Sequence, residues 1–225
     1  GSVEFPPPTN LCINMMPFRM GDVSSLPEEC KSYWPLILAC QRAAMDEEKG
    51  KICYLTVHES HVVEGESQRR SGIHTDAPGY IMREPGRWKL ALWGGAGWNS
   101  ANRIATLPHG GIFIASSVSG SCRVWDALVV APNAGGDIEH LRPYLGNGAS
   151  LEAGQLAWLT DQTPHESLPL AVGTYRQFFR VVTSELSVWF EQHSTPNPLC
   201  NDLGPSVEIL KYDKFRFAEP SHTDL

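Results

Sequence analysis

The chain has 225 residues, 42% of them apolar, and 25 acidic against 18 basic side chains give it a net charge of −7. This acidic balance argues against a general nucleic-acid binder. No run of about 18 apolar residues is present, so no membrane span is expected. Six scattered cysteines without a Cys-x-x-Cys pair favour reduced thiols and a cytoplasmic location over a disulfide or zinc framework.

No internal stretch has the composition of a flexible linker, so one domain is expected. Within it we expect an N-terminal arm and helices over 1–50, a β-barrel core over 51–190 and a C-terminal extension over 191–225. The opening Gly1-Ser2, without a Met, resembles the remnant of a cleaved tag, and a natural targeting segment could precede it.

The first 50 residues predict an arm followed by helices. Pro6–Pro8 and Pro17 favour an extended arm that does not join a central strand. Ser25 followed three residues later by Glu28 has the pattern of a capping box and predicts the start of a helix. A second helix is expected over about 35–50, and the pair should support one side of a sheet.

After residue 50 the pattern changes to short runs that are typical of strands bounded by turn residues. Ser119-Gly120-Ser121 is short enough to predict a hairpin, and Asp137–Tyr144 predicts a short helix capped by Asp137. A succession of short strands predicts a mainly β fold of the sandwich, jelly-roll or barrel kind. The runs are Ile52–His58, Trp88–Trp93, Gly111–Val118, Cys122–Val130, Gln155–Leu159 and Tyr175–Ser184.

The segment His74-Thr75-Asp76 is a candidate for metal binding. Side chains two residues apart lie on one face of an extended chain, so an imidazole and a carboxylate could share an ion. A further imidazole would complete the two-His, one-carboxylate face that suits iron and leaves coordination positions open. A loop turn in which Asp76 caps an amide is the alternative. A second His-x-Asp, 222–224, is set aside because chain ends fray and no His follows it.

The segment 151–180 contains the missing imidazole. It contains, in this order, a strand that begins near Gly154, a loop, the pair Pro164-His165, a turn, and a returning strand with Arg176. Together with the His-x-Asp pair, this order resembles the core of the Fe(II)/2-oxoglutarate-dependent dioxygenase superfamily over roughly residues 52–185, without indicating a subfamily.

The resemblance implies a double-stranded β-helix, which is a jelly-roll or cupin-like barrel, with a few flanking N-terminal helices. It implies that His74, Asp76 and His165 hold Fe(II), and that Arg176 binds the distal carboxylate of 2-oxoglutarate with its guanidinium fork. The implied reaction consumes O2, releases succinate and CO2, and commonly hydroxylates its substrate. The compact, acidic chain favours a small-molecule or amino-acid-type substrate.

Three more arginines are candidates for binding anions. Arg180 would share a strand face with Arg176, and it could hold cosubstrate, substrate or a structural carboxylate. We expect Arg176 to be the anchor, because the preceding turn should bring the start of the strand to the metal end. Arg69 and Arg70 precede the His-x-Asp pair and could meet an anionic substrate, with a solvated basic turn as the alternative.

Two other functions stay open at this stage. One is a non-catalytic β-barrel that uses its pocket as a binding or sensor module. The other is an Fe(II) enzyme that uses the same triad without 2-oxoglutarate. A separate metal site at His58 and His61 is not expected, because side chains three apart on a strand face opposite sides.

Overall fold

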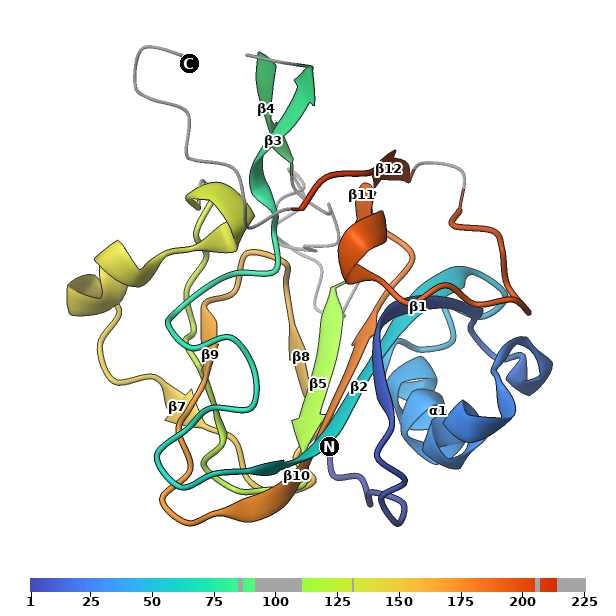
Figure 1. Cartoon of the computed structure of the whole chain (residues 1–225), viewed down its shortest axis with the longest axis horizontal. Coiled ribbons are helices and arrows are strands. Elements are labelled where there is room, and N and C mark those ends of the chain that lie inside the picture. The colour runs from blue at the N-terminus through green and yellow to red at the C-terminus, as the bar shows by residue number, and fades with distance from the viewer. Residues whose placement is uncertain (85–86, 92–110, 131, 205–206, 214–225) are drawn as a thin grey trace.

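The structure is a computed structural model of the chain that describes residues 1–84, 87–91, 111–130, 132–204 and 207–213. Its elements are mainly strands in antiparallel sheets, with one α-helix, α1 (Trp34–Ala43), near the N-terminus (Figure 1). The predicted mainly β class with flanking N-terminal helical structure is therefore confirmed. Within these ranges, no helix has the length and apolar character needed to cross a bilayer.

The largest sheet has five strands in the order β1-β2-β10-β5-β8, and neighbouring strands are antiparallel. The long strands β2 and β10 lie at its centre, paired from Thr174 opposite Val62 to Val182 opposite Tyr54. Its strands are β1 (Cys12–Arg19), β2 (Ile52–Val62), β10 (Thr174–Val182), β5 (Ile112–Ser116) and β8 (Ala157–Leu159).

Three smaller sheets complete the described structure. In Figure 1, β7 and β9, which share a sheet with β6, lie across from the five-stranded sheet, while the β3–β4 hairpin projects from one end. The bounds are β7 (Ala149–Ser150), β6 (Cys122–Val124) and β9 (His165–Ser167) in one sheet, β3 (Gly79–Glu84) and β4 (Arg87–Ala91) in the second, and the parallel pair β11 (Val188–Phe190) and β12 (Glu208–Leu210) in the third.

Alternate residues of β2 and β10 pack into two different cores. One core, on the outer face of the five-stranded sheet, joins Leu55, Val57, Phe179 and Val181 to α1. The other core, on the inner face, contains residues of the same strands that point the opposite way, such as Tyr54 and Phe178, together with apolar side chains of β5, β6 and β11. Arg176 and Arg180 belong to the Phe178 side of β10, so two arginines are directed toward the barrel interior.

Several local expectations were wrong. Residues beyond Cys12 do not stay in an extended arm but form β1, whose position at the sheet edge tolerates Pro17. The turn at Gly120 does not close a hairpin, because β5 and β6 belong to different sheets. Trp93, the end of one expected strand, and the second His-x-Asp pair at 222–224 lie outside the described residues.

Helical segments lie where the sequence predicted them, but their helix type, caps or ends differ from the prediction. Glu28–Tyr33 is a 3-10 helix whose N-cap is Pro27, and Ser25 does not cap it. The next helix, α1, ends at Ala43, before residue 50. Glu139–Tyr144 is also a 3-10 helix, and Asp137 does not cap it.

Candidate metal centre

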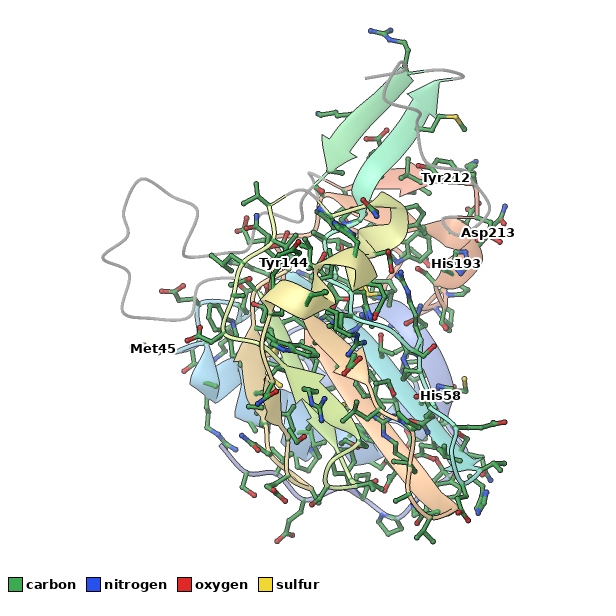
Figure 2. The ribbon with its side chains drawn as sticks, turned by 90° about the vertical axis from the view of Figure 1, so that its left-hand side faces the viewer. Met45, His58, Tyr144, His193, Tyr212 and Asp213 are labelled. Atoms are coloured by element: carbon green, nitrogen blue, oxygen red, sulfur yellow. The ribbon has the colours of Figure 1, made fainter. Side chains whose placement is uncertain are left out.

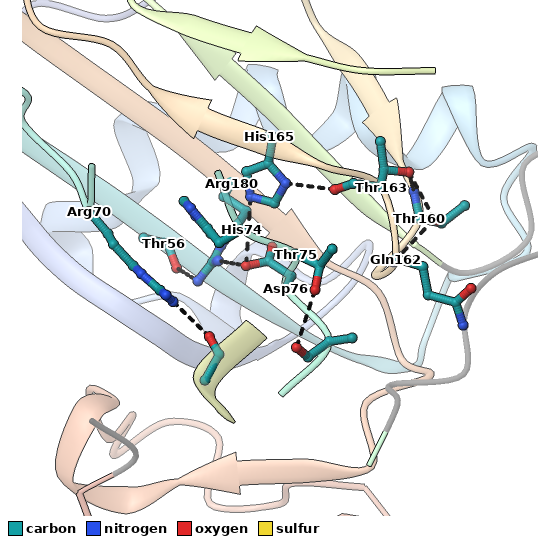
Figure 3. A network of polar contacts seen from close by, with 12 residues as sticks. Thr56, Arg70, His74, Thr75, Asp76, Thr160, Gln162, Thr163, His165 and Arg180 are labelled. Atoms are coloured by element: carbon teal, nitrogen blue, oxygen red, sulfur yellow. Dashed lines mark hydrogen bonds and ion pairs between the residues drawn. The ribbon is translucent and has the colours of Figure 1, made fainter. Parts of the chain in front are cut away.

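His74 and His165 are brought together by their own backbones. The amide of His74 donates to the carbonyl of His165 over 3.0 Å, and the amide of His165 donates to the carbonyl of His74 over 2.9 Å. Since this reciprocal pairing places the two residues directly opposite each other, their ring centroids are 4.6 Å apart (Figure 3).

Neighbouring segments hold the His-x-Asp stretch on both sides of the ligand positions. The amide of Ile73 donates to Glu139 Oε2 over 2.8 Å, and the amide of Thr75 donates to the carbonyl of Gly136 over 2.8 Å. Gly136 has a φ of 82°, and a Cβ at this position would lie 2.2 Å from the carbonyl oxygen of Thr75. Glycine is therefore required for this close approach.

Both imidazoles have the tautomer that a metal ligand needs. The Nδ1 of His74 lies 2.9 Å from the carbonyl oxygen of Gly72, and the Nδ1 of His165 lies 2.9 Å from that of Thr163. A carbonyl only accepts, so each Nδ1 carries a proton, and in the neutral form of either ring the lone pair is on Nε2. Burial, followed by the neighbouring His165, lowers the pKa of His74 to about 3. This ring is therefore neutral near pH 7, as ligation requires.

A tight polar turn fixes the carbonyl that orients His165. The amide of Thr160 donates to Thr163 Oγ1 over 3.0 Å, and the amide of Gln162 donates to Thr160 Oγ1 over 3.2 Å (Figure 3). The two threonine hydroxyls are 2.8 Å apart. Sequence reasoning missed these positioning residues, although two threonines spaced around the loop before Pro164-His165 are a usable signal.

Asp76 is held by Arg180. Its Oδ1 accepts from Arg180 Nη1 over 2.8 Å, and both side chains are 9% exposed. Arg180 also donates to Thr56 Oγ1 over 3.2 Å and contacts Asn14 Oδ1 at 3.4 Å. The carboxylate is thereby oriented from behind, with its Oδ1 4.0 Å from His165 Nε2.

The donor set fits iron in type, while the carboxylate stands slightly apart. Two facial ligands at about 2.1 Å from one ion are about 3 Å apart. Asp76 would therefore have to approach His165 by about 1 Å to share an ion with it. As the side chains stand, no group of three or more His, Cys, Asp or Glu among the described residues is arranged to hold a metal ion.

Two cavities meet at this centre. The larger, of about 310 Å³, is bordered by His74 and Asp76, and the smaller, of about 40 Å³, is bordered by His74 and His165. Arg69 and Arg180 border both. An ion held by the candidate ligands would therefore lie at the junction, within reach of both cavities.

Arg176 is fully buried near the smaller cavity and has neutral partners. It donates to Ser116 Oγ over 3.0 Å, to Ser167 Oγ over 2.9 Å and to Cys122 Sγ over 3.0 Å. The expectation that Arg176 lies at the metal end of the strand was wrong, because Arg180 contacts Asp76 there. Arg176 lies four residues further from that end, beside the layer formed by Cys122 and Ser167.

Arg69 and Arg70 are adjacent in sequence but have different surroundings. Arg70 donates to the carbonyl of Gly135 over 2.7 Å and contacts Asp137 Oδ1 at 3.4 Å. Arg69 lies over the ring of Phe178, 5.1 Å from its centroid, while Arg176 lies 5.6 Å from the same centroid. Arg70 therefore links two loops, whereas Arg69 points to the junction of the cavities.

Comparison with known proteins gives distant likenesses only. No protein-family model and no curated protein matches the sequence. Among solved structures, the chain is similar to HygX from Streptomyces hygroscopicus with iron bound, with a TM-score of 0.42 and 9% identity over 74% of this chain and 71% of that one. It is also similar to the non-heme monooxygenase ThoJ in its apo form, with a TM-score of 0.32 and 14% identity over 58% of this chain and 45% of that one. Both likenesses are too distant to assign a family or a reaction.

Proposed function

We propose that this chain is a non-haem Fe(II)- and 2-oxoglutarate-dependent dioxygenase that hydroxylates a small-molecule or amino-acid-type substrate. The observation that supports it most is the reciprocal backbone pairing of His74 and His165, which aligns two imidazoles beside the carboxylate of Asp76. Two imidazoles and one carboxylate are the facial ligand set that suits Fe(II) and leaves positions for a cosubstrate and O2.

The position of Arg176 supports 2-oxoglutarate as the cosubstrate. Its guanidinium is buried, and none of the hydrogen bonds described for it goes to a carboxylate. A buried cation without a matched anion is costly, and a ligand carboxylate would offset that cost. Because the metal end of the strand is at Arg180, an extended dicarboxylate bound at the metal would place its far end toward Arg176.

The protein's own residues would orient and shield this chemistry. Bound Fe(II) would supply activation of O2, coupled to oxidative decarboxylation of 2-oxoglutarate to succinate and CO2 and to oxidation of a substrate C–H bond. Gly72 and Thr163 hold the protons of the two imidazoles at Nδ1, and Arg180 orients Asp76. Arg176 would bind the distal carboxylate, and Phe178 would exclude water beside it.

The decisive experiment is uncoupled turnover of 2-oxoglutarate. Fe(II) is added under nitrogen, O2 and 2-oxoglutarate follow, and succinate is measured. Succinate formation is expected in the wild type and not in His165→Ala. No metal binding would favour a non-catalytic binding module. Metal binding without any 2-oxoglutarate binding would favour an iron enzyme that uses the triad alone.

Two arginine variants test the cosubstrate site. Arg176→Ala should raise the KM for 2-oxoglutarate about 30-fold to several-thousand-fold, the effect of losing a buried bidentate carboxylate contact, and should leave metal affinity nearly unchanged. Arg180→Ala should raise this KM far less. Arg123→Ala, which removes a half-exposed arginine that lies 3.8 Å from Glu166, is the control. A larger loss for Arg180→Ala would exchange the two roles.

A further inference from the structure

The larger cavity is bordered by more cationic than anionic side chains. Arg69, Arg70 and Arg180 border it, and Asp76 is the carboxylate among its described lining residues. Arg180 pairs with Asp76. Arg70 contacts Asp137, a residue that does not border the cavity. Among the arginines of this lining, Arg69 is therefore the one for which the described part of the chain provides no ion-pair partner.

Arg69 has no hydrogen-bond or ion-pair partner within the part of the chain that the structure describes. Its charged group packs on the Phe178 ring instead. Burial, together with the charges of Arg180 and Arg176, lowers the pKa of Arg69 to about 10, although Asp76 acts in the opposite direction. A guanidinium has five donors in a planar fork, and here an anion would both accept from them and reduce the repulsion.

Another part of the cavity lining is apolar and aromatic. Val188, Trp189 and Phe190 of β11 and Met15 of β1 border it. Trp189 is fixed, because its Nε1 donates to the carbonyl of Met15 over 2.8 Å. An apolar body could pack against this surface while an acid group reaches Arg69.

Two histidines besides His74 border the cavity. His58 borders it from β2, and His193 borders it from the turn after β11. In Figure 2, His193 lies beside Asp213, and its Nε2 is 2.6 Å from Asp213 Oδ1. Asp213 does not border the cavity in the described structure, so this pair adds no carboxylate that could neutralise Arg69.

We propose that the larger cavity takes an organic acid as substrate, with Arg69 binding its carboxylate, phosphate or sulfate group and β11 packing against its apolar body. The inference rests on the proposed function only in assigning this ligand as the substrate. Arg69 is suited to this role because it is half-buried at the solvent-connected cavity, whereas Arg176 is fully buried.

Matched acid and amide ligands test the inference. The full chain is titrated calorimetrically with a panel of aryl-alkyl carboxylates, their primary amides, and the corresponding phosphate and sulfate esters, before and after addition of Fe(II) and 2-oxoglutarate under nitrogen. The best acid should bind about 10- to 100-fold more tightly than its neutral counterpart, the effect of a charge-assisted hydrogen bond. The phosphate and sulfate arms identify which acid group the site prefers.

Arg69→Gln should abolish this preference, Arg69→Lys should keep part of it, and Arg123→Gln, at an arginine that does not border this cavity, should keep all of it. Equal binding of acids and amides, absence of acid binding, or a preference that survives Arg69→Gln would overturn the inference. So would a loss of 2-oxoglutarate affinity in Arg69→Gln without any change in acid preference, because Arg69 would then serve the cosubstrate. If Fe(II) and 2-oxoglutarate do not bind but the Arg69-dependent preference is present, the proposed function fails and the anion site stands.

Discussion

Glu59 and Arg176 are both buried, on the paired strands β2 and β10, but they lie on opposite faces of the sheet. The two charged groups differ in the partners that the chain provides for them. On the outer face, the Glu59 carboxylate accepts from the amides of Thr9 and Leu11 over 2.6 and 2.9 Å. It also accepts from the hydroxyl of Tyr33 over 2.6 Å and from Gln177 Nε2 over 3.2 Å. Both carboxylate oxygens are therefore satisfied within the chain.

On the inner face, Arg176 is buried among two serine hydroxyls and a thiol. Burial lowers its pKa, although the neighbouring Cys122 opposes the shift. Arg69, which approaches the same Phe178 ring from a loop, has no described carboxylate partner either. Within the described residues, the inner face thus keeps the charges of Arg176 and Arg69 without a carboxylate partner.

The comparison distinguishes a buried carboxylate that stabilises the fold, Glu59, from buried arginines that we propose bind ligands. A fully hydrogen-bonded buried network rigidifies the structure, whereas an incompletely matched one is destabilising unless something else completes it. The Glu59 network ties the N-terminal arm to β2 and β10. On the inner face, Arg69 and Arg180 border the cavities at the candidate metal centre, and Arg176 lies further along β10.

Removing an imidazole from the inner face should have the largest effect on metal binding. His165→Ala should weaken Fe(II) binding by more than about 100-fold, since even loss of a residue that only orients a ligand commonly costs 10- to 100-fold. The unfolding midpoint should change little by comparison. Equilibrium dialysis under nitrogen measures the affinity. His61→Ala, which removes an exposed imidazole from β2, is the control, and equal affinities in both variants would remove His165 from the centre.

Removing the outer carboxylate should affect stability and spare the metal. Glu59→Ala leaves four donors of the network without their acceptor, and we expect the free energy of unfolding to fall by about 2–4 kcal/mol. Urea denaturation measures the loss, with the exposed Glu64→Ala as the control. If Glu59→Ala instead weakens Fe(II) binding while stability is retained, the separation between the two faces is wrong.

The sequence predicted the mainly β class because turn residues and short apolar runs are local signals. It did not predict β1, since Pro17 argues against a strand until the strand is known to lie at an edge. It also could not show that the chain changes sheets at Gly120. That change depends on long-range pairing of β5 with β10 and of β6 with β9.

For the candidate site, the two blocks of sequence motif identified His74, Asp76 and His165, and the structure brings these residues together. Their function as ligands stays a prediction. The prediction that Arg176 lies nearer to the candidate metal centre than Arg180 was wrong. Which position of β10 lies beside that centre depends on the strand register. Glu59 and Thr160 were missed because their importance comes from partners distant in sequence or from a local turn.

A backbone variant tests whether the inner site depends on close packing. Gly136→Ala would place a Cβ 2.2 Å from the carbonyl of Thr75, so the His-x-Asp segment must shift. Fe(II) affinity should fall about tenfold, the lower end for lost orientation of a ligand. Gly50→Ala is a matched control, since Gly50 has a φ of 81° and no atom within 4 Å of its ideal Cβ. Equal metal affinities in the two variants would show that the segment tolerates displacement.

The smallest expected effect is the response of the Glu59 network to acid. Burial by itself would raise the pKa of Glu59, but the hydrogen bonds from Tyr33, Leu11, Thr9 and Gln177 outweigh it and lower the pKa. A carboxylate whose pKa is lower in the folded state stabilises the fold above its unfolded pKa of about 4.3, and this contribution is lost as the pH falls through the folded value. The difference in unfolding free energy between wild type and Glu59→Gln should therefore be constant near pH 7 and should become smaller below about pH 4.3.

Urea denaturation at several pH values measures this difference. The same difference for Glu64→Gln, at an exposed site, should show little pH dependence. A difference that stays constant or widens in acid would mean that the network does not bind Glu59 as a carboxylate, and the contrast between the faces would then lie in packing instead of charge.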